Sequence, residues 1–167
     1  MIKTDRENLL LYELNERIDV RKFCCEDDEV NDYFYNKALT NNLKLISKTY
    51  VVINKNNNDV VGIFTLSASL LKLTGKEQYG ISRVPTILLG RIGIDNKYRK
   101  QNLGQFLLEQ AIGICEAVKK LIGCRLLITE STSGSKTLTY FKNLGFKYET
   151  TDKRSGKIFE VLSFDLF

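Results

Sequence analysis

The sequence predicts a mixed α/β domain of the α+β type that spans residues 1–167. Three observations predict this fold class. Apolar runs of strand length recur along the chain, one strongly periodic amphipathic helix lies between two of them, and no repeat, low-complexity tract or linker divides the sequence. A chain of 167 residues is long enough to bury a core without disulfides or metals. We therefore expect a single domain.

Composition excludes several functional classes. The chain contains no histidine, and its four cysteines show no CxxC spacing. Histidine-based triads and histidine metal sites are thereby excluded, and we expect no metal. The N-terminus lacks the charge and apolar pattern of a signal peptide, and the longest apolar stretch, residues 60–71, is too short to span a bilayer. We expect a cytoplasmic protein without membrane contact.

The first half of the chain reads as strands around one helical region. Residues 9–15 form an apolar strand. The segment 24–46 begins with acidic residues, which suit a helix N-terminus, and an apolar face at helical spacing follows. That face comprises Val30, Phe34, Ala38 and Leu43. Strands at residues 47–54 and 59–73 form a hairpin across an Asn-rich turn.

The second half is built around a central strand and a long helix. After a polar connection, residues 86–95 are apolar on both faces, as expected at the centre of a sheet. A helix follows, ending at Gly123. Its apolar positions recur at steps of three and four residues: Leu103, Leu107, Ala111, Ile114, Val118 and Leu121. Cys115 falls near this face as a core residue. A strand at 124–131, a short helix at 133–145 and a terminal hairpin complete the chain.

The loop between the central strand and the long helix suits an anionic ligand. A helix N-terminus offers unpaired N–H groups and the positive end of its dipole. Gly104 lets a ligand approach the backbone, and further donors come from Arg99, Lys100, Gln101 and Gln105. The alternative is that Asn102 simply caps the helix, with Gln105 returning the bond. The net charge of +5 and pI of about 9.0 favour a phosphate-bearing ligand or nucleic acid without choosing between them.

The segment LLGRIGIDNKYRKQNLGQFLLEQA, residues 88–111, resembles the acetyl-CoA-binding segment of the GNAT-type N-acetyltransferases. The loop of that family reads Gln/Arg-x-x-Gly-x-Gly/Ala, and residues 99–104 match it with Asn102 in place of the first glycine. Asparagine tolerates positive φ better than most residues, so we expect the loop shape to be kept. TYFKNLGF, residues 139–146, resembles the F-Y-x-x-x-G-F segment of the family. The resemblance covers nearly the whole chain.

This resemblance implies the GNAT fold, a mixed, mostly antiparallel sheet flanked by helices and splayed between the strands 86–95 and 124–131. Acetyl-CoA is the implied cosubstrate, with its carbonyl near the backbone of residues 92–94 and its pyrophosphate on residues 99–105. The implied cofactor-binding residues are Ile92, Gly93, Ile94, Arg99, Lys100, Gln101, Asn102, Leu103, Gly104, Gln105 and Ser131.

Four further segments narrow the resemblance to the GNAT toxins of toxin–antitoxin systems. They are FCCEDDEVNDYF (23–34), SKTYVVI, GIFTLSAS and PTILLGRIGID. The implied reaction is acetylation of the α-amine of aminoacyl-tRNA, and the implied partners are a ribbon–helix–helix antitoxin and a second copy of the chain. The basic residues near the expected site are Arg83, Arg91, Lys97, Arg99, Lys100, Lys44 and Lys48. Two alternatives stay open: an N-acetyltransferase for a small-molecule or protein amine, and a catalytically impaired acyl-CoA-binding or interaction module.

One position departs from the family pattern. The family has a tyrosine that acts as general acid where this chain has Phe141, and Tyr140 precedes it. Neighbouring helix positions lie about 100° apart, so three interpretations remain: the acid is dispensable, Tyr140 reaches the sulfur from a shifted helix, or catalysis is impaired. Glu130 and Asp95, at strand ends, are candidate bases, although solvated strand-end carboxylates are more common. Ser131 similarly suits a turn or cap as well as a ligand contact.

Overall fold

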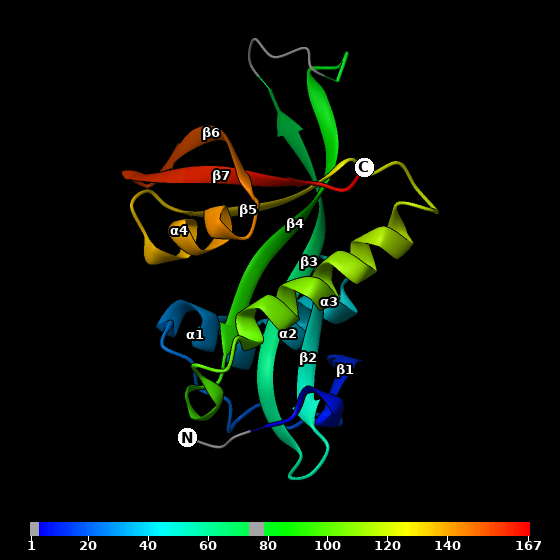
Figure 1. The fold of residues 1–167 in the computed structure, drawn as a ribbon, viewed down its shortest axis with the longest axis vertical. Helices are drawn as coiled ribbons and strands as arrows, with labels where there is room; N and C mark the ends of the chain where they lie inside the picture. Colours follow the sequence, from blue (N-terminus) through cyan, green and yellow to red (C-terminus); the bar gives the residue numbers. More distant parts are fainter. Residues whose placement is uncertain (1–3, 74–78) are drawn as a thin grey trace. The chain divides into compact units, whose positions relative to one another are not determined.

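The computed structural model describes residues 4–73 and 79–167 (Figure 1). Its strands hydrogen-bond in the order β1-β2-β3-β4-β5-β7-β6. The strands are β1 (Leu9–Glu13), β2 (Lys48–Asn54), β3 (Asp59–Lys72), β4 (Arg83–Ile94), β5 (Leu126–Thr132), β6 (Lys147–Arg154) and β7 (Lys157–Asp165). The helices are η1 (Arg6–Asn8), α1 (Asp28–Asn36), α2 (Ala38–Leu43), η2 (Asn96–Tyr98), α3 (Leu103–Val118) and α4 (Lys136–Asn143).

The sheet is mixed and mostly antiparallel, which confirms the predicted fold class. The strand pairs β1–β2, β2–β3, β5–β7 and β6–β7 are antiparallel, and β4 pairs with β5 in parallel. Two compact units share these elements. Unit 1 comprises residues 1–67 and 91–111, and unit 2 comprises residues 68–90 and 112–167. The single-domain assignment of residues 1–167 stays a prediction, and each unit is described by itself.

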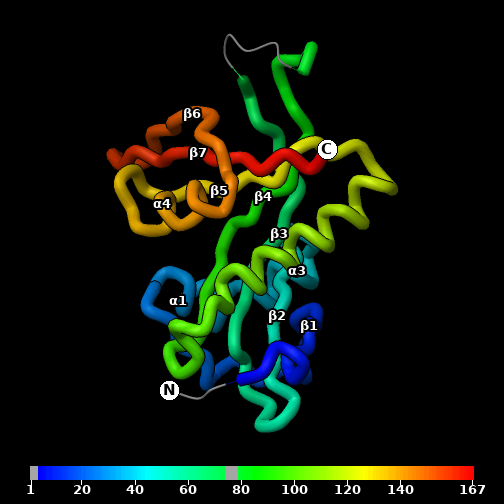
Figure 2. Tube along the Cα trace, in the orientation of Figure 1, coloured from blue at the N-terminus to red at the C-terminus, as the bar shows by residue number. Residues whose placement is uncertain are grey.

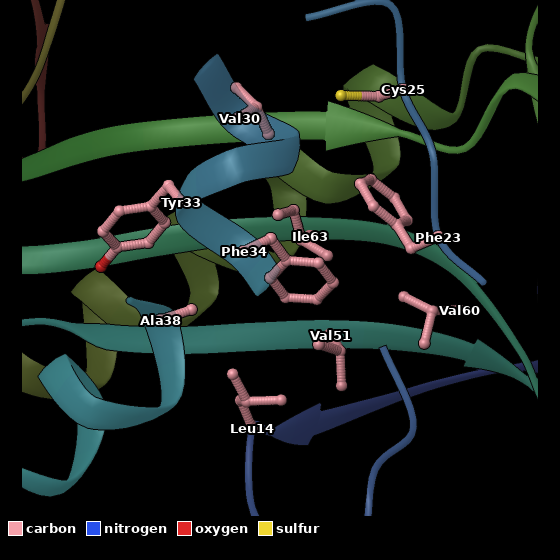
Figure 3. Packing of buried hydrophobic residues seen from close by; sticks show 10 residues of the cluster. All are labelled: Leu14, Phe23, Cys25, Val30, Tyr33, Phe34, Ala38, Val51, Val60 and Ile63. Atoms are coloured by element: carbon pink, nitrogen blue, oxygen red, sulfur yellow. The ribbon is translucent and has the colours of Figure 1, made fainter. Parts of the chain in front are cut away.

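In unit 1, helix α1 begins where the sequence predicts a helix start. The side chain of Asp27 accepts hydrogen bonds from the backbone N–H groups of Glu29 at 2.9 Å and Val30 at 3.2 Å, the arrangement of an N-cap. Val30, Phe34 and Ala38 are buried as predicted and pack against strands β2 and β3 (Figure 3). These three residues belong to the hydrophobic core of unit 1.

Leu43 is not part of that core, contrary to the sequence prediction. Its side chain is 64% exposed. The helical region is broken at Lys37, whose φ of −129° separates α1 from α2. Ala38 begins α2 and is buried, but Leu43 follows it by five residues, a step of about 140° around the helix, and therefore leaves the apolar face.

Two glycines show how α1 and the first half of α3 lie on the sheet of unit 1. A Cβ on Gly62 of β3 would lie 2.8 Å from Leu107 of α3, whereas a Cβ on Gly93 of β4 would lie 3.2 Å from Val30 of α1. Ile63, the neighbour of Gly62, packs in the α1 core. Because successive strand residues face opposite sides, the two helices cover opposite faces of these strands.

In unit 2, apolar residues of β4, β5 and β7 form the core. Val84, Leu126, Ile128 and Val161 are buried there together. Helix α4 is capped by Ser135, whose hydroxyl accepts from the backbone N–H of Leu138 at 3.3 Å. The hairpin of β6 and β7 runs beside β5 (Figure 2). This is the strand–helix–hairpin arrangement that the sequence predicts for its C-terminal part.

The second half of α3, also in unit 2, confirms one expectation and corrects another. Cys115 is fully buried, and burial raises the pKa of its thiol to about 12, so it is a core residue. The helix ends at Val118, before the predicted Gly123, and Leu121 is 85% exposed. The N–H groups of Leu121 and Ile122 both donate to the carbonyl of Val118 in a closing turn, which carries Leu121 off the apolar face.

Strand β4 is longer than predicted at its start. It begins at Arg83 and includes Pro85, whose carbonyl accepts from the N–H of Arg125 at 2.9 Å. The predicted connection 74–85 falls partly outside the described residues. Among the helices of the described residues, none is long and apolar enough to cross a membrane.

Candidate functional site

The loop before α3 has the backbone shape expected of an anion-binding turn. Lys100 and Asn102 both adopt left-handed conformations, with φ of 61° and 55°. The expectation that Asn102 takes the positive φ of the glycine it replaces is confirmed. Backbone N–H groups in such turns converge into a concavity that suits anions. An N-cap residue normally has extended dihedral angles, so the conformation of Asn102 does not fit the simple capping alternative.

Buried hydrogen bonds hold this loop in place. Tyr98 is fully buried, and its hydroxyl donates to Asp59 Oδ2 at 2.9 Å. Gln101 Oε1 accepts from the N–H of Thr4 at 2.9 Å, and Gln101 Nε2 donates to the carbonyl of Tyr98 at 3.2 Å. The side chain of Gln101 therefore braces the loop. Gln105 Nε2 donates to Glu109 Oε1 at 3.0 Å on the exposed side of α3.

Two charged residues that the sequence analysis did not assign contact the loop. Arg99 forms a salt bridge with Glu26, one of the acidic residues that the sequence explained only as a helix start. Arg6 Nη2 donates to the carbonyl of Asn102 at 3.5 Å, and its guanidinium lies 5.7 Å from the ring centroid of Phe106. No local sequence pattern predicts the contact of Arg6 with the loop, because its partners lie almost a hundred residues away in the sequence.

The end of strand β4 contains the three residues predicted to lie near the acetyl carbonyl. Ile92, Gly93 and Ile94 are half-buried, and the parallel ladder with β5 pairs residues only as far as Leu89. Within unit 1, the N–H of Arg91 donates to Thr65 Oγ1 at 3.0 Å. The bulge-like opening expected here stays a prediction.

The carboxylate of Asp95, one candidate base, is occupied by hydrogen bonds to the backbone. Its side chain is buried, accepting from the N–H of Cys24 at 3.0 Å and from the N–H of Lys97 at 2.8 Å. These bonds fix the turn that leads from β4 into η2. The carboxylate thus stabilises the backbone around the loop.

Unit 2 carries the other predicted site residues. Glu130 forms a two-pronged ion pair with Arg154, with oxygen–nitrogen distances of 2.8 and 3.0 Å. Hydrogen bonding to Glu130 raises the pKa of Arg154. Ser131 Oγ lies 2.9 Å from Ser135 Oγ, which caps α4. Glu130 is therefore an ion-paired carboxylate and not a solvated one, and Ser131 contacts the residue that caps α4.

The two aromatic residues of α4 differ sharply in exposure. Phe141 is 1% exposed and packs edge-on against Phe146 at 5.1 Å between ring centroids. Tyr140 is 38% exposed and lies 5.8 Å from the ring centroid of Phe141. Position 141 is therefore a core position, whereas Tyr140 is the partly exposed tyrosine of the helix.

Replacing Glu130 by glutamine tests whether this carboxylate is a base. Because it is held by Arg154, we expect kcat to fall by less than about 3-fold, compared with the 100-fold or more typical of a lost general base. Unfolding should become easier by at most about 1 kcal/mol, the value of a partly exposed ion pair. Arg154→Gln is the matched control, and thermal unfolding accompanies the kinetics. A large loss of kcat in Glu130→Gln alone would restore Glu130 as the base.

No family model matches the sequence. Among curated proteins, the chain is 26% identical over 143 residues to the tRNA-acetylating toxin of Mycobacterium tuberculosis, covering 83% of this chain and 84% of that protein. Among solved structures, AtaT complexed with acetyl-methionyl-tRNAfMet has a TM-score of 0.80 at 20% identity and 94% coverage of each chain. A tyrosine-to-phenylalanine mutant of KacT has a TM-score of 0.80 at 19% identity and 95% coverage of each chain.

A tyrosine-to-phenylalanine mutant of the AtaT toxin, bound to acetyl-CoA and the C-terminus of the antitoxin AtaR, has a TM-score of 0.77 at 22% identity. The alignment covers 95% of this chain and 94% of the mutant chain. The fold of this chain is that of these solved toxins, which confirms the predicted GNAT fold, and its sequence is similar to that of the tRNA-acetylating toxin.

Proposed function

We propose that the protein is an acetyl-CoA-dependent N-acetyltransferase whose acceptor is the α-amine of aminoacyl-tRNA, and that it acts as a toxin by blocking translation. The observation that carries the proposal is the loop at residues 99–105, with two left-handed residues at the N-terminus of α3. The curated relative acetylates tRNA according to its name, and a structural neighbour holds acetyl-methionyl-tRNAfMet.

The residues of the loop fit the pyrophosphate of acetyl-CoA. The backbone turn and the start of α3 supply N–H donors, while Arg99 and Lys100 are exposed and cationic. Gly104 lies half-buried in the first turn of α3, where no Cβ obstructs a ligand. We assign Ile92, Gly93 and Ile94 to the carbonyl of the acetyl group, because the ladder of β4 with β5 ends at Leu89 and backbone N–H groups beyond it suit an oxygen that gains charge during the reaction.

Acetyl-CoA supplies an activated acetyl group as a thioester, which the acceptor amine takes up with release of the CoA thiol. An aminoacyl ester amine is largely neutral near pH 7, so little help from a base is needed. Tyr140 supplies the proton that the departing sulfur requires, since it is the accessible phenol of α4. Phe141 keeps the helix packed. Ser131 holds the cap of the same helix through Ser135.

Because translation takes place in the cytoplasm, we propose that the protein acts there. A ribbon–helix–helix antitoxin is the proposed partner, as neighbours are solved with the antitoxin AtaR, and a homodimer is proposed from the family resemblance.

The deciding experiment follows acetyl transfer directly. Purified protein is incubated with labelled acetyl-CoA and a pool of charged tRNA, with uncharged tRNA as the control, and binding of acetyl-CoA is measured calorimetrically on the same sample. Label is expected only in charged tRNA. Binding of acetyl-CoA without any label in tRNA would overturn the acceptor assignment and favour a small-molecule or protein amine, or a module that binds without catalysis.

A further inference from the structure

Arg91 is one of the basic residues near the predicted site that lack a carboxylate partner in the described part of the chain, and its guanidinium is stacked on an aromatic ring. In unit 1, several other basic residues near that site have carboxylate partners. Lys48 pairs with Glu13, Lys97 with Asp59 and Arg99 with Glu26. Across residues 4–73 and 79–167, the structure shows no salt bridge to Arg91. Its guanidinium instead lies over the ring of Tyr33, 3.9 Å from the centroid.

The aromatic seat of Arg91, which is the ring of Tyr33, is held firmly by its neighbours. Tyr33 is 5% exposed and belongs to the α1 core, and Figure 3 shows its ring beside β4 with the hydroxyl turned away from Phe34. That hydroxyl lies 2.8 Å from Ser47 Oγ and accepts from Asn41 Nδ2 at 3.3 Å. The N–H of Arg91 is fixed by Thr65. Stacking on an aromatic ring leaves the edges of a guanidinium available to donate.

The position of Arg91 points to the acceptor rather than the cofactor. It directly precedes Ile92, the first residue assigned to the acetyl carbonyl. It shares the α1 face of β4 with Gly93, the face opposite the one covered by α3. The cationic groups assigned to the cofactor pyrophosphate lie later in the chain, at Arg99 and Lys100. An exposed, pre-oriented guanidinium beside the reacting carbonyl matches the two-pronged geometry of a phosphodiester.

We propose that Arg91, held on the ring of Tyr33, binds a backbone phosphodiester at the aminoacylated end of the acceptor tRNA and so positions its α-amine. This rests on the proposed function, because it names how the same site recognises its acceptor. Arg91 is a specificity-determining residue that recognises the nucleic acid part of the substrate. It contributes nothing to an acceptor that lacks phosphate.

The test compares Arg91→Gln with Arg17→Gln, which removes the same charge from an exposed position elsewhere in unit 1. Two acceptors are used, aminoacyl-tRNA and an amino-acid methyl ester without phosphate. For Arg91→Gln we expect a KM for aminoacyl-tRNA about 10-fold higher, the usual range for one lost charged contact. The slope of log affinity for tRNA against log salt should become shallower by about 0.7, the value for one phosphate of a single strand. Acetyl-CoA affinity, kcat and methyl-ester kinetics should match those of Arg17→Gln.

A second pair of variants tests the aromatic contact and the shape of the guanidinium separately from its charge. Tyr33→Phe keeps the ring but loses the bonds of its hydroxyl to Ser47 and Asn41, so its KM for aminoacyl-tRNA should lie between those of the wild type and Arg91→Gln. Arg91→Lys keeps the charge but loses the two-pronged geometry, so its KM should also be intermediate. If active wild-type protein and Arg91→Gln share the same KM and salt slope, the inference fails and the proposed function stands. Equal losses with the methyl ester also overturn it. Wild-type protein that binds acetyl-CoA but neither binds nor acetylates charged tRNA overturns the proposed function and the inference together.

Discussion

Replacing Tyr140 by phenylalanine is expected to lower kcat for acetyl transfer about 100-fold, the lower end of what a general acid contributes. A phenol that gives a proton to a ligand has to be accessible, and Tyr140 is 38% exposed whereas Phe141 is 1% exposed. The substitution removes only the hydroxyl and keeps the ring contact with Phe141. The KM for acetyl-CoA should change little, and steady-state kinetics with charged tRNA measure both constants.

Phe141→Tyr is the complementary variant, because it restores the residue that the family pattern has. We expect no gain in kcat. The added hydroxyl enters a packed aromatic cluster with Phe146, and a buried hydroxyl without a partner lowers the free energy of unfolding by about 1–3 kcal/mol, visible as a lower Tm. A large gain in kcat from this variant, with Tyr140→Phe unaffected, would show that position 141 faces the thioester and that the native protein lacks its acid.

Replacing Asn102 by valine is expected to weaken acetyl-CoA binding about 10-fold. Asn102 has a φ of 55°, where an ordinary L-residue pays roughly 1–2 kcal/mol and a β-branched residue is a genuine outlier. A loop forced out of this shape loses the convergence of its N–H groups. The affinity ratio follows from the same free energy, and isothermal titration with CoA measures it.

Asn102→Gly is the matched control, since glycine adopts positive φ freely and restores the family pattern. It should bind CoA at least as tightly as the wild type, and both variants should unfold at similar temperatures because Asn102 is exposed. Equal affinities for the valine and glycine variants would mean that the loop conformation does not control cofactor binding.

Local patterns predicted most of the fold. Val30, Phe34 and Ala38 are buried as their spacing indicates, and the loop and long helix begin where the sequence places them. Two predictions were wrong for different reasons: Leu43 lies within α2 but off the face of Ala38, and Leu121 lies beyond the end of α3. At Leu121 the apolar spacing of the sequence continues past the end of the helix, so the spacing alone does not locate that end.

The candidate site was predictable only in part, for a related reason. The backbone shape at Asn102 follows from the residue type and its place in a motif. The partners of Arg99 and Glu130 do not, because Glu26 and Arg154 approach them through tertiary packing. The seat of Arg91 on Tyr33 likewise joins residues far apart in the chain. Composition identifies which side chains carry charge, and only the fold decides which charges neutralise one another.

The segment before α1 braces the end of β4 from the side. Phe23 and Cys25 close on Gly93 at 3.3–3.4 Å from the position of a Cβ, while Cys24 bonds to Asp95 and to the N–H of Asn96. The conformational entropy of this strand end is therefore lost when the chain folds. In the proposed function it is not lost again when the thioester binds, so the backbone dipoles assigned to the reacting carbonyl need no reorganisation in each turnover.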